Sequence, residues 1–188
     1  EVKKPFYIKT YGVEATVKIT TSSATPAIFY SFDNTNWNGS VKPTTSAPIE
    51  ISMGNNLIVY FKCKDAGVSF KGVKFTSSGQ FDVGGNILSL VHPTTWVNPQ
   101  GAINQDSNFA NMFLNNKNIQ HAERLCLGAT SHLLTADNGT GATSSYGGEA
   151  DAYHPYSVTS NVFNGMFKNS TLISAPQGLG AIKSNGAK

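Results

Sequence analysis

The chain has 188 residues, a length that suits one large domain or two small ones. Aromatic residues make up 11% of it and charged residues only 13%, which excludes a disordered chain and favours strands and turns over long helices. The net charge of +3 is mild and the lysines are dispersed, so nucleic-acid binding is not expected. No apolar run approaches the roughly 20 residues that span a bilayer, so membrane insertion is not expected either.

Short β-rich runs alternate with turn-rich segments between residues 6 and 90. The alternation has period two: Val17 and Ile19, for example, fall on one face of a run and Lys18 on the other. Short strands divided by such turns at regular spacing are typical of an antiparallel sandwich. Residues 1–92 are therefore predicted to form an Ig-like β-sandwich domain.

The run "YSFDNTNW", at residues 30–37, is similar to the Asp-box, a hairpin motif of sialidase propellers. An Asp-box has a Gly between its Asp and Thr, and its Trp lies one residue further from its Ser than Trp37 lies from Ser31. The departures favour an ordinary hairpin turn. In that turn Asp33 is predicted to accept backbone N–H bonds and Asn34 to adopt a left-handed conformation.

The alternating pattern of the sequence ends before residues 93–101, where Pro93 and Pro99 indicate a linker. Residues 102–188 then contain two similar stretches, "NFANMFLNNKNIQHAE" and "NVFNGMFKNSTLISAP". Apolar residues three and four apart predict a short helix in this repeat, followed by a strand. An internal repeat of this kind indicates a solenoid, in which each unit buries its apolar face on its neighbour.

An insertion at residues 135–156 separates the two copies and is rich in Gly, Ser, Ala and Tyr. Exposed tyrosines on adaptable loops are typical of recognition surfaces, because their rings give a large contact area at low entropy cost. The candidate ligand-binding residues are therefore Tyr146, Tyr153, His154 and Tyr156. The alternative is that Tyr153 and Tyr156 pack on the core of the repeats.

Five motifs occur in a specific order: "PFYIKTYG", "YSFDNTNW", "GGNILSLV", "MFLNNKNIQHAE" and "MFKNSTLISAP". In this order the chain resembles the BspA-like leucine-rich-repeat surface proteins of gut Bacteroidetes and their phages, over nearly its whole length and more firmly up to Ala122. It differs from them in Asn34, where the family has Gly, in having only two repeats, and in the insertion. The resemblance implies a small β-sandwich followed by a short, irregular leucine-rich-repeat segment. It also implies surface adhesion or binding rather than a reaction.

No pattern of residues indicates catalysis or a metal site. The histidines form no HExxH pair, and His121, Cys126 and His132 fit no common spacing of zinc ligands. Glu149 and Asp151 lie in a Gly-rich loop, a poor frame for the paired carboxylates of a glycosidase. We therefore expect no enzyme activity, no cofactor and no metal.

The sequence predicts a non-enzymatic extracellular binding or adhesion module, on a bacterial cell surface or in a phage virion as a fibre or decoration component. The alternative is an accessory carbohydrate-binding domain of a larger carbohydrate-active enzyme. The partner would be a protein or glycan on a cell surface. Because the tail after the second repeat is too polar to cover that repeat, either the chain continues beyond Lys188 or it forms a homo-oligomer. The predicted interface residues are Phe163, Met166, Phe167 and Leu172.

Overall fold

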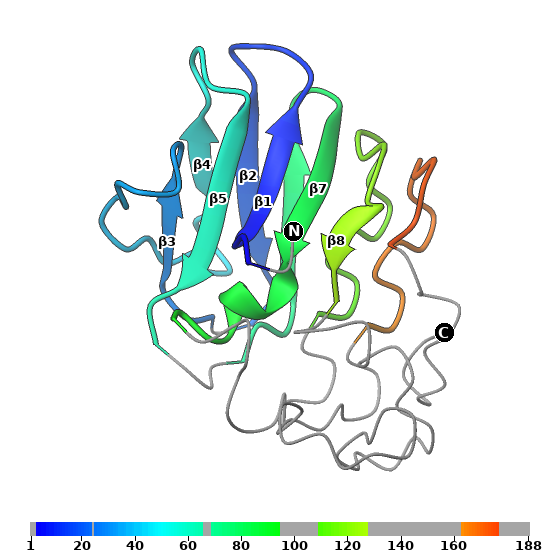
Figure 1. The fold of residues 1–188 in the computed structure, drawn as a ribbon. Helices are drawn as coiled ribbons and strands as arrows, with labels where there is room; N and C mark the ends of the chain where they lie inside the picture. The colour runs from blue at the N-terminus through cyan, green and yellow to red at the C-terminus, as the bar shows by residue number, and fades with distance from the viewer. Residues whose placement is uncertain (1–2, 24, 66–68, 95–108, 128–162, 177–188) are drawn as a thin grey trace, which may run out of the picture.

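The structure, a computed structural model, describes residues 3–23, 25–65, 69–94, 109–127 and 163–176. Within these residues the elements follow the order β1 (Phe6–Thr10), β2 (Thr16–Thr21), β3 (Ile28–Ser31), β4 (Ile49–Ser52), β5 (Ile58–Cys63), β6 (Val73–Ser77), β7 (Phe81–Asn86), the 3₁₀ helix η1 (Ile87–Leu90) and β8 (Arg124–Cys126). One sheet has the order β3-β5-β1-β7-β8 and the other the order β4-β2-β6. All pairs of strands are antiparallel except β7 with β8. The sheets form two layers (Figure 1), and the predicted mainly β fold with two antiparallel-rich sheets is confirmed.

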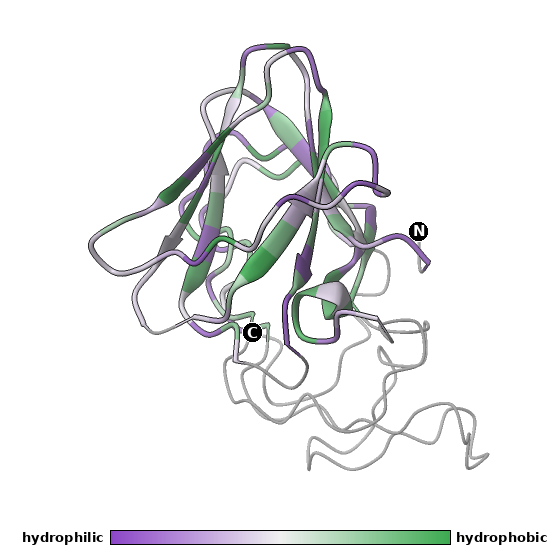
Figure 2. Ribbon diagram, turned by 90° about the vertical axis from the view of Figure 1, so that its left-hand side faces the viewer, coloured by the Kyte–Doolittle hydropathy of each residue, from purple (hydrophilic) through white to green (hydrophobic). Residues whose placement is uncertain are grey.

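Period-two alternation gives each strand one face toward the space between the sheets. In β2, Val17 and Ile19 are fully buried whereas Lys18 is only partly covered, as predicted. β5 alternates in the same way along its length. Figure 2 views the molecule from its side, and hydrophobic stretches lie along strands of both layers.

The core between the layers is built on phenylalanine rings. Phe6 and Phe61 belong to the five-stranded sheet, and each lies 5.2 Å, between ring centroids, from Phe75 of the three-stranded sheet. All three side chains are fully buried. Burial of one such side chain stabilises a fold by about 1.5–3 kcal/mol, so this cluster holds the two sheets together.

The motifs "PFY" and "GGNILSL" meet at one end of the five-stranded sheet. Gly85 has φ 74°, and a Cβ there would overlap the carbonyl oxygen of Pro5. Asn86 starts η1 by accepting the Leu88 N–H on its side-chain oxygen, at 3.0 Å. The hydroxyl of Ser89 accepts the Phe6 N–H (2.9 Å) and donates to the carbonyl of Phe61 (2.8 Å). The two motifs therefore depend on each other for their positions, because Gly85 lies against Pro5 and Ser89 bonds to Phe6.

Residues 109–127, the first unit, extend both sheets at the same edge of the molecule. The carbonyl of Met112 accepts the N–H of Phe75 on β6 (3.2 Å), and the carbonyl of Asn118 accepts the N–H of Phe81 on β7 (3.0 Å). β8 then continues the five-stranded sheet parallel to β7. One part of the first unit, around Met112, thus lies beside the three-stranded sheet, and another part, from Asn118 to β8, lies beside the five-stranded sheet.

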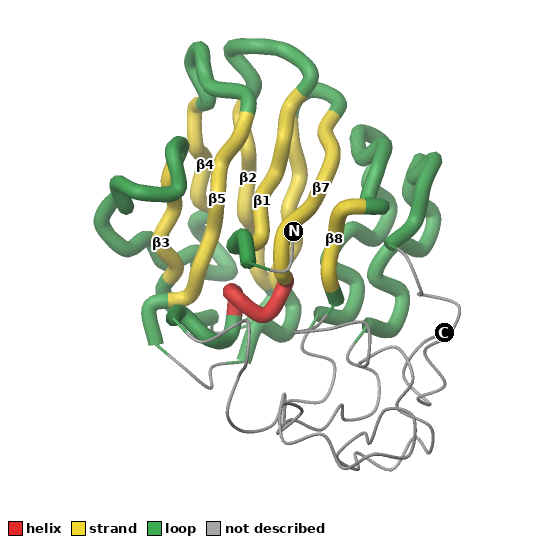
Figure 3. The backbone as a smooth tube through the Cα atoms, viewed as in Figure 1, coloured by secondary structure: helices red, strands yellow, loops and turns green. Residues whose placement is uncertain are grey.

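Residues 163–176, the second unit, stack on the first unit in the same direction (Figure 3). The rings of Phe113 and Phe167 are stacked at 5.3 Å with 7° between their planes, and those of Phe109 and Phe163 at 5.8 Å with 16°. The N–H of Phe113 donates to the carbonyl of Met166 at 2.8 Å. The two copies identified in the sequence therefore lie side by side, with corresponding residues in contact.

The helix expected in the repeat is absent from both units. Residues 109–115 and 163–169 form turns, and among the described residues η1 is the only helix. Asn111 and Asn115 each have φ 59°, a left-handed conformation that interrupts a right-handed helix. The prediction of short helices in this segment is wrong for the residues that the structure describes.

The described residues on both sides of the predicted linker share one core. The ring of Phe113, in the first unit, lies 6.4 Å from those of Phe6 and Phe81 in the five-stranded sheet. Most of the linker lies outside the described residues, and so does the insertion. The division into domains 1–92 and 102–188 stays a prediction.

Candidate binding surface

The five-stranded sheet has an outward face, away from the core, that is unusually aromatic. Alternation with the buried positions assigns ten strand residues to this outward sheet face. They are Phe29, Ser31, Ile58, Tyr60, Lys62, Tyr7, Lys9, Asp82, Gly84 and Arg124. Ser31, Tyr7 and Gly84 are buried beneath their neighbours, and the other seven are partly or fully exposed.

The strand register arranges these residues in a row across the sheet. Tyr60 lies opposite Ser31 on one side and opposite Tyr7 on the other. The Tyr7 and Tyr60 rings make an edge contact, with centroids 5.7 Å apart. Tyr7 is in turn opposite Gly84, and Gly84 is opposite Arg124. Rings from two strands therefore lie between the β3 edge and a guanidinium group on β8.

A lysine lies between two further rings at the β3 end of the row. The Nζ of Lys62 is 4.2 Å from the centroid of the Trp37 ring and 5.9 Å from that of Phe29. A cation over an aromatic face contributes roughly 0.5–1 kcal/mol at an exposed site, more when it is desolvated. Trp37 and Phe29 are half-buried rather than core residues, so part of each ring remains in contact with solvent.

The turn before Trp37 is held by the carboxylate of Asp33. This carboxylate accepts the N–H groups of Asn36 (2.7 Å) and Thr35 (2.8 Å), the amide of Asn36 and the hydroxyl of Ser31. These hydrogen bonds, the backbone ones first, hold the pKa of Asp33 well below its usual range. Asn34 has φ 62°. The predicted hairpin turn is confirmed, and Asp33 is committed to positioning the loop that carries Trp37.

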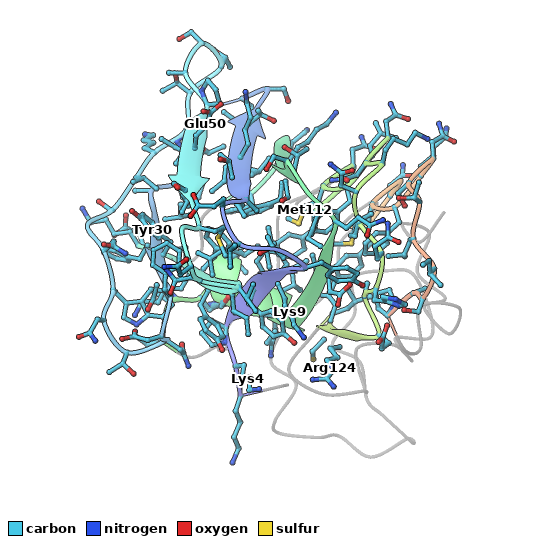
Figure 4. All side chains as sticks on the ribbon, turned by 90° about the horizontal axis from the view of Figure 1, so that it is seen from above. Lys4, Lys9, Tyr30, Glu50, Met112 and Arg124 are labelled. Atoms are coloured by element: carbon cyan, nitrogen blue, oxygen red, sulfur yellow. The ribbon has the colours of Figure 1, made fainter. Side chains whose placement is uncertain are left out.

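The opposite face of the molecule has a different composition. The outward residues of the three-stranded sheet are Thr16, Lys18, Thr20, Glu50, Ser52, Lys74 and Thr76, without an aromatic ring. Lys18 and Glu50 neutralise each other at 3.0 Å. Figure 4 looks along the layers and shows Lys9 and Arg124 on one side of the molecule and Glu50 on the other. Aromatic rings are thus confined to the outward sheet face. Among the described residues that face also has three cations without a carboxylate partner, against Lys74 alone on the opposite face.

One carboxylate, that of Asp82, lies at an outward position of the five-stranded sheet. Its Oδ1 accepts the hydroxyl of Tyr11 at 2.7 Å. Partial desolvation of Tyr11, which stays 50% exposed, and then its hydrogen bond to the Asp82 carboxylate raise the pKa of Tyr11 to about 12, so this hydroxyl keeps its proton at neutral pH. Asp82 is therefore already engaged by a donor, whereas none of the three cations of the face is paired with a carboxylate among the described residues.

A histidine, a serine and a glutamate meet where the second unit joins the first. The Nδ1 of His121 lies 2.7 Å from the hydroxyl of Ser174, which donates to the carboxylate of Glu123. That carboxylate is 3.5 Å from the same Nδ1. In a catalytic triad the serine and the acid bind opposite ring nitrogens, so that the imidazole relays a proton between them. Here both bind one nitrogen, and the arrangement fastens the two units together.

The predicted site residues fall into two groups. Tyr146, Tyr153, His154 and Tyr156 lie outside the described residues. Of the predicted interface residues, Phe163 and Met166 are buried within the chain, whereas Phe167 and Leu172 are half-buried and pack against the core. Ile173, which was not among the predicted residues, is 69% exposed.

No group of three potential metal ligands occurs within the described part of the chain. Both cysteines are free thiols. Burial raises the pKa of Cys63 to about 12, so this thiol has little thiolate character and little reactivity. The candidate site among the described residues is therefore a surface, formed by side chains of five strands and one loop.

No family model, curated protein or solved structure matches this chain. Within the described residues no helix is long and apolar enough to cross a membrane. The function is therefore argued from the outward sheet face itself.

Proposed function

We propose that this chain is a non-enzymatic binding module that attaches to a cell-surface partner through the outward sheet face. The observation that carries the proposal is the contrast between the two outward faces. One has aromatic rings and three cations without a carboxylate partner among the described residues, and the other has no ring and one such cation, Lys74. Folding does not require this contrast, because Tyr60 and Trp37 lie outside the core cluster. Half-exposed Trp and Tyr side chains are typical of recognition surfaces.

The setting we propose is extracellular, on a bacterial cell surface or in a phage virion. The resemblance to BspA-like surface proteins supports this setting. The same resemblance supports an Ig-like sandwich for the two sheets and the beginning of a leucine-rich-repeat stack for the two units. The stacked pair Phe113 and Phe167 is consistent with such a stack, and so are the left-handed residues Asn115 and Asn169 at corresponding positions.

The second candidate is an accessory carbohydrate-binding domain of a larger enzyme. It is favoured by the same rings, since flat aromatic faces pack on the C–H faces of sugars. In that role the chain would serve a separate catalytic part, whereas an adhesion module acts by itself. Neighbouring genes for virion proteins would favour the first candidate, and neighbouring genes for polysaccharide uptake the second.

The experiment that tests the proposal measures attachment of fluorescently labelled protein to gut bacterial cells and to mucin-coated surfaces. Lys62→Ala and Tyr60→Ala should each reduce attachment to the best-binding surface by about tenfold, the loss typical of a central contact. Lys74→Ala, which removes the same charge from the opposite sheet, should leave it unchanged. Equal attachment of all three variants and the wild type would refute a binding role for the outward sheet face.

A further inference from the structure

The outward sheet face has a net positive charge. Of its four charged side chains, Lys9, Lys62 and Arg124 are cations, and Asp82 is the only acid. Within the described part of the chain, none of the three cations forms an ion pair with a carboxylate. Charges that stay unpaired on a binding surface are available to a ligand of the opposite sign.

The cations are interleaved with rings rather than clustered. Lys62 lies over Trp37 and beside Phe29, while Arg124 lies on the strand next to Gly84, which the Tyr7 ring covers. Strands spaced about 4.8 Å apart place the β3 and β8 ends of this row about 19 Å from each other. A ligand that follows the row meets rings and positive charges along one extended path.

The chemistry of this path suits a charged sugar polymer. A pyranose ring has apolar C–H faces that pack flat on aromatic rings, and a carboxylate or sulfate at its edge can reach a neighbouring cation. Repetition of that unit matches the repetition of ring and cation across the sheet. Single-stranded nucleic acid also combines stacking with negative charge. However, it carries one phosphate per nucleotide, and three dispersed cations on a chain of net charge +3 would neutralise few of them.

We infer that the outward sheet face binds an anionic polysaccharide, with Trp37 and Tyr60 against the sugar rings and Lys62, Lys9 and Arg124 against its carboxylate or sulfate groups. This inference rests on the proposed binding function and names the ligand class for the same surface. Lys62 has the central role, because its ammonium group lies against the Trp37 ring where a bound sugar would stack. An acidic group on that sugar would exchange a cation–π contact of Lys62 for a charge-assisted hydrogen bond.

The test measures binding of the whole chain to immobilised polysaccharides by biolayer interferometry. The anionic probes are polygalacturonate, chondroitin sulfate and polysialic acid, and fully methyl-esterified polygalacturonate is the uncharged match for the first. The inference expects binding to at least one anionic probe that weakens as salt is raised. For polygalacturonate, esterification should reduce affinity about tenfold or more.

The variants separate the contribution of charge from that of the rings. Lys62→Ala and Trp37→Ala should each weaken binding about tenfold, whereas Lys62→Arg should largely retain it. Lys74→Ala is the control for a lysine lost from the opposite sheet. Melting curves of each variant show that the fold is intact, and Lys62→Ala alone suffices if Trp37→Ala does not fold.

Several outcomes would overturn the inference. Binding to none of the three anionic polymers would overturn the ligand class, and so would equal binding to the esterified polymer. If cell attachment remained sensitive to Lys62→Ala in either case, the proposed binding function would stand with a different ligand. Tighter binding to oligo-dT than to every polysaccharide, lost in Lys62→Ala, would assign the face to nucleic acid instead.

Discussion

The ring of Tyr7 lies directly over Gly84, its partner on the neighbouring strand, so closely that a Cβ on Gly84 would overlap the ring. The contact flattens Tyr7 onto the sheet and brings its ring between Tyr60 and the strand that carries Arg124. A glycine at this position therefore shapes the outward sheet face as well as the strand that contains it.

Gly84→Ala should destabilise the protein by about 1–3 kcal/mol, because the methyl group has no space beneath the ring. Chemical denaturation of the wild type and the variant measures this difference. Tyr7→Ala combined with Gly84→Ala should cost less than the sum of the single changes, since removal of the ring removes the overlap. Gly79→Ala is the matched control, because a Cβ at Gly79 meets nothing within 4 Å. Additive effects of the two changes would show that the ring does not cause the destabilisation.

The Asp33 turn should make stability sensitive to acid. Its folded pKa is lowered, chiefly by the N–H groups of Asn36 and Thr35, so its stabilising contribution is complete above its unfolded pKa of about 3.9. The contribution is lost as the pH falls below that value, because the unfolded state then binds a proton that the folded state does not. Urea unfolding should therefore show a steeper loss of stability between about pH 5 and pH 2 for the wild type than for Asp33→Ala.

Between about pH 6 and pH 8 the stability curves of the wild type and Asp33→Ala should run parallel, since the carboxylate is ionised in both states there. Identical slopes at low pH would contradict the prediction. Asn34→Gly provides a further check on the same turn. It should be tolerated because φ is 62° at this position, whereas Asn34→Ala should cost about 1 kcal/mol.

We expect one cluster to hold the two units together rather than to catalyse a reaction; it consists of Ser174, His121 and Glu123. The hydrogen bond that Glu123 accepts from Ser174 is the largest cause of the lowered pKa of Glu123. Ser174→Ala should therefore move that pKa back toward its usual range. A ¹³C NMR titration of the Glu123 carboxyl group measures the change. Amide exchange of Ala122, whose N–H donates to the Ser174 carbonyl at 2.8 Å, should become faster in the same variant.

Ser170→Ala is the control for Ser174→Ala, because the Ser170 hydroxyl donates within its own unit, to the carbonyl of Phe167. That variant should leave the Glu123 titration unchanged. Hydrolysis of a nitrophenyl ester that disappeared in Ser174→Ala would contradict the structural role and indicate a nucleophilic serine.

Local patterns in the sequence predicted local structure well. The alternation of Val17 and Ile19 with Lys18 gave the buried face of a strand, and Asn34 marked a left-handed turn. The helix expected in the repeat failed for a physical reason. Phe109 and Phe113 are spaced as in a helix, but left-handed Asn111 between them forms a turn that points both rings toward the neighbouring unit.

The outward sheet face could not be predicted because it depends on strand order. Tyr7 and Tyr60 are far apart in the sequence and become neighbours only because β5 pairs with β1. Lys62 reaches Trp37 only because β3, with the loop after it, lies beside β5. The sequence did show that each of the runs "FYIKT" and "IVYFKC" has a tyrosine and a lysine at the positions that alternate with its buried residues. That pattern does not identify which runs share a face.

The exposed edge of the second unit should associate with another chain. In the first unit the N–H groups of Asn111, Phe113 and Asn115 donate to carbonyl groups of the second unit. The corresponding donors of the second unit have no acceptor among the described residues; they are the N–H groups of Gly165, Phe167 and Asn169. Beside them Ile173 is 69% exposed and Phe167 only half-buried. Burial of about 300 Å² of apolar surface there would contribute about 7 kcal/mol before the cost of association.

Sedimentation should therefore show association of the chain at micromolar concentration. Ile173→Asp and Phe167→Asp should each abolish it, because a carboxylate buried without a partner is strongly unfavourable. Val13→Asp is the matched control: Val13 is 55% exposed but belongs to the loop between β1 and β2 and to neither unit. Loss of association in Val13→Asp as well would mean that net charge, and not the edge, controls it. A strictly monomeric wild type would show that this edge is not an interface between copies of the chain, and Phe167 and Leu172 would then serve the stack of the two units alone.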